Sequence, residues 1–318
     1  MSLVSLHRST NYDPAYLDDA LTQLLAPMGG MATFVRPGDR VLLKPNLLTG
    51  ARPTKECTTR PALVRAVAQQ VLAVGGNPFL GDSPAFGSAR GVAKANGLLA
   101  VAEELHLPLV EFSGDRYANG GAIANLRLSK EAMGADVVIN LPKVKSHMQL
   151  TLTLGVKNLF GCVPGKMKAW WHMELGKNPP LFAQMLLETA QAINPQLTIA
   201  DGIVGHEGNG PSGGEPRFLG VLAASADVFA LDRVLVELLG VPPERVPTVA
   251  LGMELGYGPD LGDIAIAGAD LADLQISDWK LPDHLIPIDF GFPRVVKSTF
   301  KHLYIKFIKE PLAAYARS

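Results

Sequence analysis

"RVLLKPNLLTGARPTKECTTRPALVRAVAQQVLAVGGNPFLGDSP", residues 40–84, contains the pattern that decides the fold. An apolar run with a polar end at 40–48 precedes an amphipathic helical pattern at 58–76, and a second apolar run at 77–84 ends in Gly-Asp-Ser-Pro. Strand, helix and strand in this order are typical of a parallel sheet with crossover helices. The sequence therefore predicts an α/β fold with a mostly parallel, doubly wound sheet.

The helix in this stretch has recognisable ends. Thr58 or Thr59 is suited to cap it, Pro61 fits its first turn, and two glycines follow it.

Further patterns along the rest of the chain continue the alternation of strands and helices. They predict helices at 89–105, 179–196 and 297–318, strands at 108–112 and from 197, a strand and helix at 218–240, and hairpins at 122–142 and 263–276.

Length and composition limit the class of protein. The 318 residues suffice for one large domain or for two lobes with a cleft, and we expect a single unit with a C-terminal extension at 259–318. A formal net charge of −1 argues against a nucleic-acid binder, which needs a surplus of Lys and Arg. A cationic site in this chain must therefore be local.

The chain carries no pattern of export or of membrane spanning. Its first residues lack the basic start and apolar core of a signal peptide, and no window reaches about 18 uninterrupted apolar residues. We therefore expect a cytoplasmic protein without a transmembrane segment. Residues 297–318 form a basic amphipathic pattern, which suits either a membrane surface or docking on the protein itself or a partner.

Polar residues follow the predicted strands, where ligands bind in parallel α/β sheets. Each position also fits an ordinary turn or helix cap. If the predicted topology is right, these residues converge on one cleft. They are Lys44 and Asn46 after the first strand, Asp82 after the next, Lys143, Lys145 and His147 after "DVVIN", Asp201 after "LTIAD", and Thr59 and Arg60 at a helix start.

Residues 140–172 concentrate cations in apolar and Gly-rich sequence. A solvated basic face would alternate Lys with acidic residues, whereas lysines in apolar sequence are often partly buried, where their pKa falls and they act as bases or nucleophiles. Histidine is the usual proton-transfer group near neutral pH. The cations are Lys143, Lys145, His147, Lys157, Lys166, Lys168 and His172.

Several cofactor sites are not supported by the sequence. No dinucleotide fingerprint or P-loop is present. The two cysteines, Cys57 and Cys162, cannot hold a four-cysteine iron–sulfur cluster or a zinc site made mainly of thiolates. The Gly-rich residues 205–214 fit either a mobile surface loop or a lid beside a strand end.

The domain of unknown function 362 family resembles this chain in the segments "VLLKPNLL", "TTRPALVRAVAQQVLAVGG", "GDSP", "NLPKVKSHMQLTLTLGVKNLFG" and "IADGIVGHEGNGPSGG". The resemblance covers roughly residues 38–235 and implies that the core of the unit lies there. Many relatives in that family carry a C-terminal ferredoxin-like module with two four-iron clusters, which this chain lacks. The resemblance thus implies that, if the protein acts in electron transfer, a ferredoxin-like partner supplies the clusters.

A more distant resemblance is to the nickel-pincer lactate racemases. Thr59-Arg60-Pro61 is similar to the cofactor-binding segment of those enzymes, and Lys157 follows a histidine and precedes Pro164-Gly165 as their cofactor-binding lysine does. The resemblance implies that Lys157 anchors a nickel-pincer nucleotide and that His147 is an acid or base. It also implies that His172 ligates the metal and that Arg60 contacts phosphate.

We therefore expect an enzyme, racemase-like or an oxidoreductase, that binds a small anion or a phosphate-bearing cofactor and transfers a proton or hydride. A redox partner or scaffold that docks an iron–sulfur protein, and a small-molecule sensor, remain alternatives. The expected catalytic residues are Lys145, His147, Lys157, Asp82 and Asp201. The expected cofactor-binding residues are Lys44, Asn46, Thr59, Arg60, Lys143, Lys157, Asn158, Gly161 and Lys166, and the expected metal ligand is His172.

Overall fold

The computed structural model describes residues 1–113, 115–118, 121–123, 125–289, 304 and 308. In these residues ten strands form one sheet, with the path β12-β1-β11-β10-β7-β2-β3-β4 and with β8 beside β10 and β9 beside β8. The strands of this sheet are β1 (Ser2–Arg8), β2 (Arg40–Pro45), β3 (Asn77–Asp82), β4 (Leu109–Glu111), β7 (Val137–Leu141), β8 (Lys143–His147), β9 (Thr151–Thr153), β10 (Leu197–Glu207), β11 (Glu215–Ser225) and β12 (Ile264–Gly268).

Most neighbouring strands of this sheet are parallel, as predicted. The parallel run extends from β10 through β7, β2 and β3 to β4, and β8 is also parallel to β10. Antiparallel pairing joins β11 to both β1 and β10, and joins β8 to β9. The carboxyl ends of β2, β3 and β7 therefore meet at one edge, which is where the site lies.

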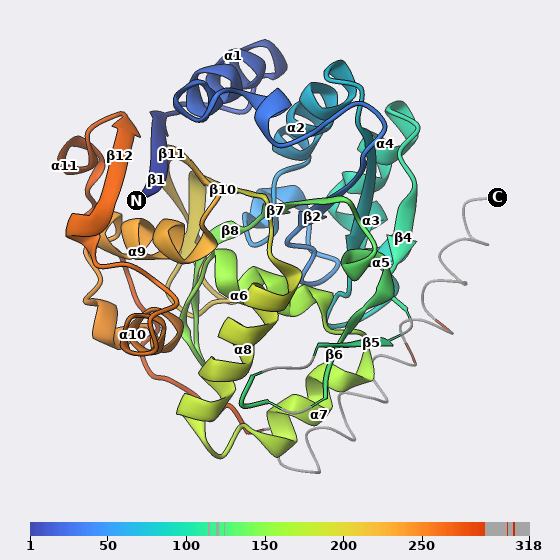
Figure 1. Ribbon diagram of the computed structural model, residues 1–318. Coiled ribbons are helices and arrows are strands. Elements are labelled where there is room, and N and C mark those ends of the chain that lie inside the picture. Colours follow the sequence, from blue (N-terminus) through green and yellow to red (C-terminus); the bar gives the residue numbers. More distant parts are fainter. Residues whose placement is uncertain (114, 119–120, 124, 290–303, 305–307, 309–318) are drawn as a thin grey trace.

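Helices cover both faces of the sheet (Figure 1). They are α1 (Pro14–Leu25), α2 (Pro61–Ala73), α3 (Ala89–Asn96), α4 (Leu98–Glu104), α5 (Lys130–Met133), α6 (Gly155–Leu159), α7 (Lys166–Glu174), α8 (Pro179–Ile193), α9 (Val228–Leu238), α10 (Pro247–Glu254) and α11 (Leu271–Leu274). In β2, Val41 and Leu43 pack in the cluster that contains α1 and α2, whereas Leu42 packs with α8 on the other face. This alternation confirms the doubly wound α/β architecture.

The main correction to the predicted elements concerns residues 143–147. The sequence predicts that they leave the sheet as polar residues after a strand, but they form the fully buried strand β8. Asp201 in β10 is opposite Lys143, and Thr153 in β9 is opposite Lys145. The two-residue period of a strand places the alternate residues 143, 145 and 147 on one face, away from Val144.

Other predicted boundaries are also wrong. The Gly-rich segment predicted as a loop is partly strand, because β10 continues to Glu207. Thr59 does not cap α2, whose N-cap is Arg60; its hydroxyl bonds to the Leu141 carbonyl instead. The predicted hairpin at 263–276 is β12 followed by α11. The hairpin predicted at 122–142 is instead β6 (Leu126–Ser129), followed by α5 and β7. The partner of β6 is β5 (Asp115–Ala118). The helix predicted at 297–318 lies almost wholly outside the described residues.

Candidate functional site

A cavity of about 260 Å³ opens beside the ends of β2 and β3. β2 delivers Asn46 to its wall, and β3 delivers Asp82. Lys145 and His147 come from β8, Lys157 comes from α6, and Lys168 and His172 come from α7. Residues more than 120 positions apart in the sequence thus surround one small space, because adjacent parallel strands end at the same edge.

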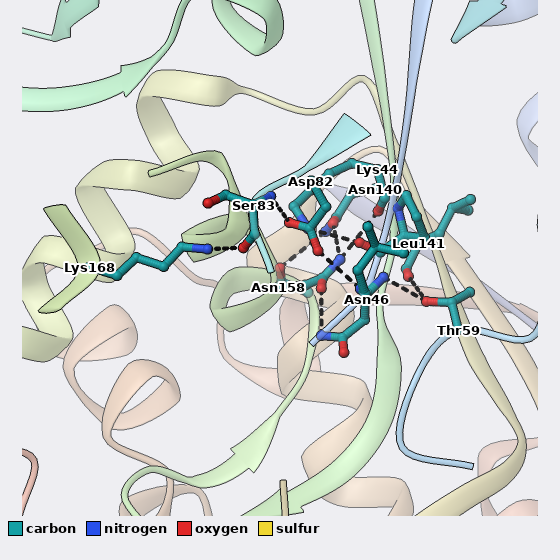
Figure 2. A network of polar contacts seen from close by, with 12 residues as sticks. Lys44, Asn46, Thr59, Asp82, Ser83, Asn140, Leu141, Asn158 and Lys168 are labelled. Carbon is teal, nitrogen blue, oxygen red and sulfur yellow. Dashed lines mark hydrogen bonds and ion pairs between the residues drawn. The ribbon is translucent and has the colours of Figure 1, made fainter. Parts of the chain in front are cut away.

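The carboxylate of Asp82, at the end of β3, is held by three contacts (Figure 2). Its Oδ1 is 3.0 Å from the Lys44 Nζ and accepts the Ser83 amide at 2.9 Å, while its Oδ2 accepts the Leu47 amide at 3.0 Å. Lys44 Nζ also donates to the Pro45 carbonyl at 2.9 Å. Asp82 therefore neutralises Lys44 and adds little free negative charge to the cavity.

Gly161 makes this ion pair possible. A methyl group at Gly161 would collide with Asp82 Oδ1 and with the end of the Lys44 side chain. Gly161 also accepts the Ser83 amide at 3.1 Å through its carbonyl. Its part in the site is thus close backbone packing against the ion pair.

Three asparagines connect β8 with α6 (Figure 2). Asn46 accepts from Lys145 Nζ at 2.8 Å and donates to Asn158 Oδ1 at 2.8 Å. Asn158 in turn donates to Asn140 Oδ1, also at 2.8 Å. Lys145 donates a further hydrogen bond, of 2.5 Å, to the Cys57 carbonyl. These amides fix both the Lys145 ammonium and the helix that carries Lys157.

Lys145, His147, Lys157 and Lys168, which we call the cationic wall, have lowered pKa values. Burial is the main cause in each case, and neighbouring lysines add to it. The pKa falls to about 7 for Lys145 and Lys157 and to about 8 for Lys168, and that of His147 falls well below its usual value. Close to neutral pH, the three lysines of the wall are therefore partly deprotonated, and His147 is neutral.

His147 has a defined tautomer. Its Nδ1 accepts the Gln149 amide at 3.1 Å, so the neutral ring carries its proton on Nε2. The residue lines the cavity, and its lowered pKa keeps the ring neutral near pH 7. His147 is thus placed to donate a hydrogen bond from Nε2 to a ligand in the cavity.

A second set of charged residues lies next to the cavity but does not line it. We call Tyr12, Glu56, Arg60, Lys143 and Asp201 the paired cluster. Lys143 Nζ is 2.9 Å from Glu56 Oε2 and 3.1 Å from Asp201 Oδ2, and Tyr12 donates to Asp201 Oδ1 at 2.6 Å. Arg60 pairs with Glu56 and donates its amide to Asp201 at 2.9 Å. Burial and Asp201 raise the pKa of Tyr12.

The structure divides the predicted site residues between three places. Asn46, Asp82, Lys145, His147, Lys157, Asn158, Gly161 and His172 line the cavity, whereas Lys143, Arg60 and Asp201 belong to the paired cluster. Lys44 and Thr59 lie behind the wall, with Thr59 accepting the Asn46 amide at 2.7 Å. Lys166 begins α7, and its side chain lies outside the described part of the chain.

Sequence reasoning missed Lys168, Tyr12 and Glu56 as site residues. Lys168 precedes His172 by four positions, so the helical period would have placed the two on one face of α7. No local pattern points to Tyr12 or Glu56, because their partners lie in distant segments. Lys168 donates to the Ser83 carbonyl across the cavity mouth.

The residues that the racemase resemblance assigns to a nickel-pincer nucleotide lie only partly at the cavity, which Lys157, His147 and His172 line. Within the described ranges no group of three His, Cys, Asp or Glu side chains is arranged to hold a metal ion. His172 contacts the Ile288 carbonyl through Nδ1 at 2.9 Å. Thr59 and Arg60, the expected nucleotide contacts, are bonded elsewhere and do not line the cavity. The site is instead suited to a small ligand.

Comparison with known proteins identifies the family. The family model "Domain of unknown function (DUF362)" matches residues 41–237, and the chain belongs to this family, as its motifs predicted. The chain is also 60% identical, over 313 residues and 98% of both chains, to "Thylakoid-associated protein sll1697" of Synechocystis sp. (strain ATCC 27184 / PCC 6803 / Kazusa).

Among solved structures, the chain matches the lactate racemase apoprotein from Thermoanaerobacterium thermosaccharolyticum. The TM-score is 0.46 and the identity 14%, with 86% of this chain and 70% of that chain covered. At this level of similarity the match bears on neither the ligand nor the reaction.

The expectation of plain cytoplasmic residence is wrong. It rested on the absence of a signal peptide, and a relative 60% identical to this chain is named as thylakoid-associated. Among the described residues, no helix has the length and apolar character needed to cross a membrane.

Proposed function

We propose that the cavity binds a small organic anion, that Lys157 moves a proton on it, and that His147 donates a hydrogen bond to it. The observation that carries this proposal is an imbalance of charge. Three lysines and two histidines line the space, while its carboxylate, Asp82, is already paired with Lys44. A bound anion would supply the negative charge that the cationic wall lacks. Because the cavity is largely shielded from water, the attraction between the anion and the wall would be stronger than at the protein surface.

The lowered pKa values of Lys145 and Lys157 support this proposal. Burial and mutual repulsion lower the pKa of Lys157 and Lys145 to about 7, so an anion placed between them would raise both values again. Binding should then take up protons near pH 7 to 8. Affinity should also weaken as the pH rises above the pKa of the free lysines.

The test combines binding with isotope exchange. Lactate, glycolate and pyruvate are titrated into the protein by calorimetry in buffers with different ionisation enthalpies, which reports the protons taken up. NMR in D₂O then follows exchange of the C2 hydrogens of lactate and glycolate and of the methyl hydrogens of pyruvate. Lys157→Met should abolish exchange, whereas Lys94→Met, on the exposed surface of α3, should leave it unchanged.

Two results of these experiments would overturn the proposal. If wild-type protein binds none of these anions and takes up no protons, the cavity is not an anion site. If exchange persists in Lys157→Met, this lysine is not the proton-transfer group.

We propose further that this protein associates with thylakoid membranes in its host, as the name of its 60% identical relative states for that protein. Separation of membrane and soluble fractions from a thylakoid-bearing host, followed by immunoblotting, tests this. Recovery wholly in the soluble fraction at low ionic strength would contradict it.

A further inference from the structure

Lys157 differs from the other two lysines that line the cavity. Lys145 Nζ donates to fixed acceptors on Asn46 and Cys57, and Lys168 Nζ donates to the Ser83 carbonyl. Lys157 Nζ makes no hydrogen bond or ion pair with the residues that the structure describes; it lies 4.7 Å from the centre of the Phe160 ring. Its nitrogen lone pair, once deprotonated, is thus available to a ligand in the cavity.

We propose that Lys157 forms an imine with small 2-oxo acids bound in this cavity. The inference rests on the proposed function, since the same cavity must first bind the carboxylate. It adds the substrate class, namely acids with a carbonyl group next to the carboxylate. It also adds a covalent step to the proton transfer.

The chemistry is balanced within the site. The neutral Lys157 amine attacks the carbonyl carbon, and a carbon–nitrogen bond forms as the carbonyl oxygen takes up a proton. The nitrogen then loses its two hydrogens, and the oxygen leaves as water, so that amine and ketone give imine and water. The neutral His147 ring is placed to donate a hydrogen bond from Nε2 to this oxygen, while the two hydrogens that leave with the oxygen come from the Lys157 amine. No oxidant, reductant or metal is needed.

Lys157 also has the protonation state that the attack requires. With its pKa lowered to about 7, about half of the Lys157 side chains are neutral at pH 7 in the protein before the acid binds. A lysine with the ordinary pKa of about 10.4 is neutral in only about one molecule in 2,500 at that pH. Reaction at neutral pH should therefore strongly favour Lys157 over surface lysines.

The surroundings select for a small acid. Lys145 and Lys168 flank the cavity and can meet the carboxylate, while Leu48 and Phe160 offer apolar contacts to a short carbon chain. The volume of about 260 Å³ lies below the ~300–1,000 Å³ of typical drug-sized sites. Acids of the size of glyoxylate or pyruvate fit this combination of charge and space.

Reductive trapping tests the proposal. Full-length protein is incubated with pyruvate or glyoxylate and cyanoborohydride at pH 7, and the product is analysed by intact-mass and peptide mass spectrometry. We expect one adduct per chain, mapped to Lys157, with a rate that rises between pH 6 and 8. L-Lactate, which has no carbonyl group outside its carboxylate, should give none.

Two variants separate binding from imine formation. Lys157→Arg keeps the positive charge but has no nucleophilic amine, so it should bind pyruvate in calorimetry and form no adduct. Lys94→Met should behave as wild type. Circular dichroism and thermal unfolding of each variant establish that it is folded.

The possible outcomes distinguish failure of the imine from failure of the anion site. Pyruvate binding without an adduct overturns the imine and leaves the proposed anion site intact. Neither binding nor an adduct, with pyruvate, glyoxylate and lactate alike, overturns both proposals. Adducts spread over surface lysines and undiminished in Lys157→Arg also overturn the imine.

Discussion

The paired cluster and the cationic wall both contain buried lysine, but its charge is used in opposite ways. Lys143 and Lys145 are two residues apart on β8, and both are buried. Lys143 meets two carboxylates, whereas Lys145 meets an amide and a carbonyl oxygen. The contacts of Lys143 neutralise its positive charge and join distant segments of the chain. The contacts of Lys145 leave its positive charge without a carboxylate partner beside the cavity. The partners of a buried lysine, more than its burial, thus indicate whether it serves the fold or a ligand.

The largest expected effect comes from breaking the paired cluster. Lys143→Met leaves the Glu56 and Asp201 carboxylates buried near a single remaining cation, Arg60. The free energy of unfolding should fall by about 3–5 kcal/mol, the usual loss when one partner of a buried pair is removed. Urea unfolding measures this. Lys143→Met combined with Asp201→Asn should recover part of the loss, and an unchanged midpoint in the single variant would show that the cluster is not structural.

A smaller loss of stability is expected from a change at Asp232, which supports the helix that carries Lys157. Asp232 accepts the Gly155 and Val156 amides at 2.7 and 3.0 Å and so holds the start of α6, which carries Lys157. In Asp232→Asn, the side-chain amide can accept only one of these bonds and presents a donor to the other, which should cost about 1–3 kcal/mol. Pyruvate affinity should fall with stability, because Lys157 loses its support. Unchanged affinity would mean that α6 is positioned by its other contacts.

The smallest effect concerns the pH dependence of stability without ligand. The folded-state pKa of Lys145, Lys157 and Lys168 is lowered, so between about 7 and 10 the unfolded chain binds more protons. Stability should therefore rise from pH 7.5 to 8.5, each such lysine adding at most about 1.4 kcal/mol per pH unit. Lys157→Met should give a shallower rise in urea titrations. Equal slopes in both proteins would show that Lys157 has an ordinary pKa.

The sequence predicts much of the architecture, because strand, helix and strand at 40–84 leave few alternatives to a parallel sheet. It also places Asn46 and Asp82 correctly, since residues after parallel strands share an edge. Prediction fails at β8. Its alternation of polar and apolar residues is typical of a half-exposed strand, but tertiary contacts bury the polar face as well.

The division between paired and unpaired lysines could not be read from the sequence. Glu56 lies 87 residues before Lys143, and Tyr12 lies 131 residues before it. Lys157, by contrast, is left without such a partner in the described residues. Local sequence shows where cations are concentrated, but only the three-dimensional arrangement shows which of them the carboxylates reach.

The alternation within β8 also limits how this region can change in evolution. Val144 packs in the apolar cluster on the opposite face from Lys143 and Lys145. Inserting or deleting one residue inside the strand would exchange the two faces, turning the lysines into the apolar core and Val144 toward the charged groups. Substitutions at single positions alter the site locally, whereas a one-residue gap would invert it. Functional relatives should therefore align across residues 143–147 without insertions or deletions.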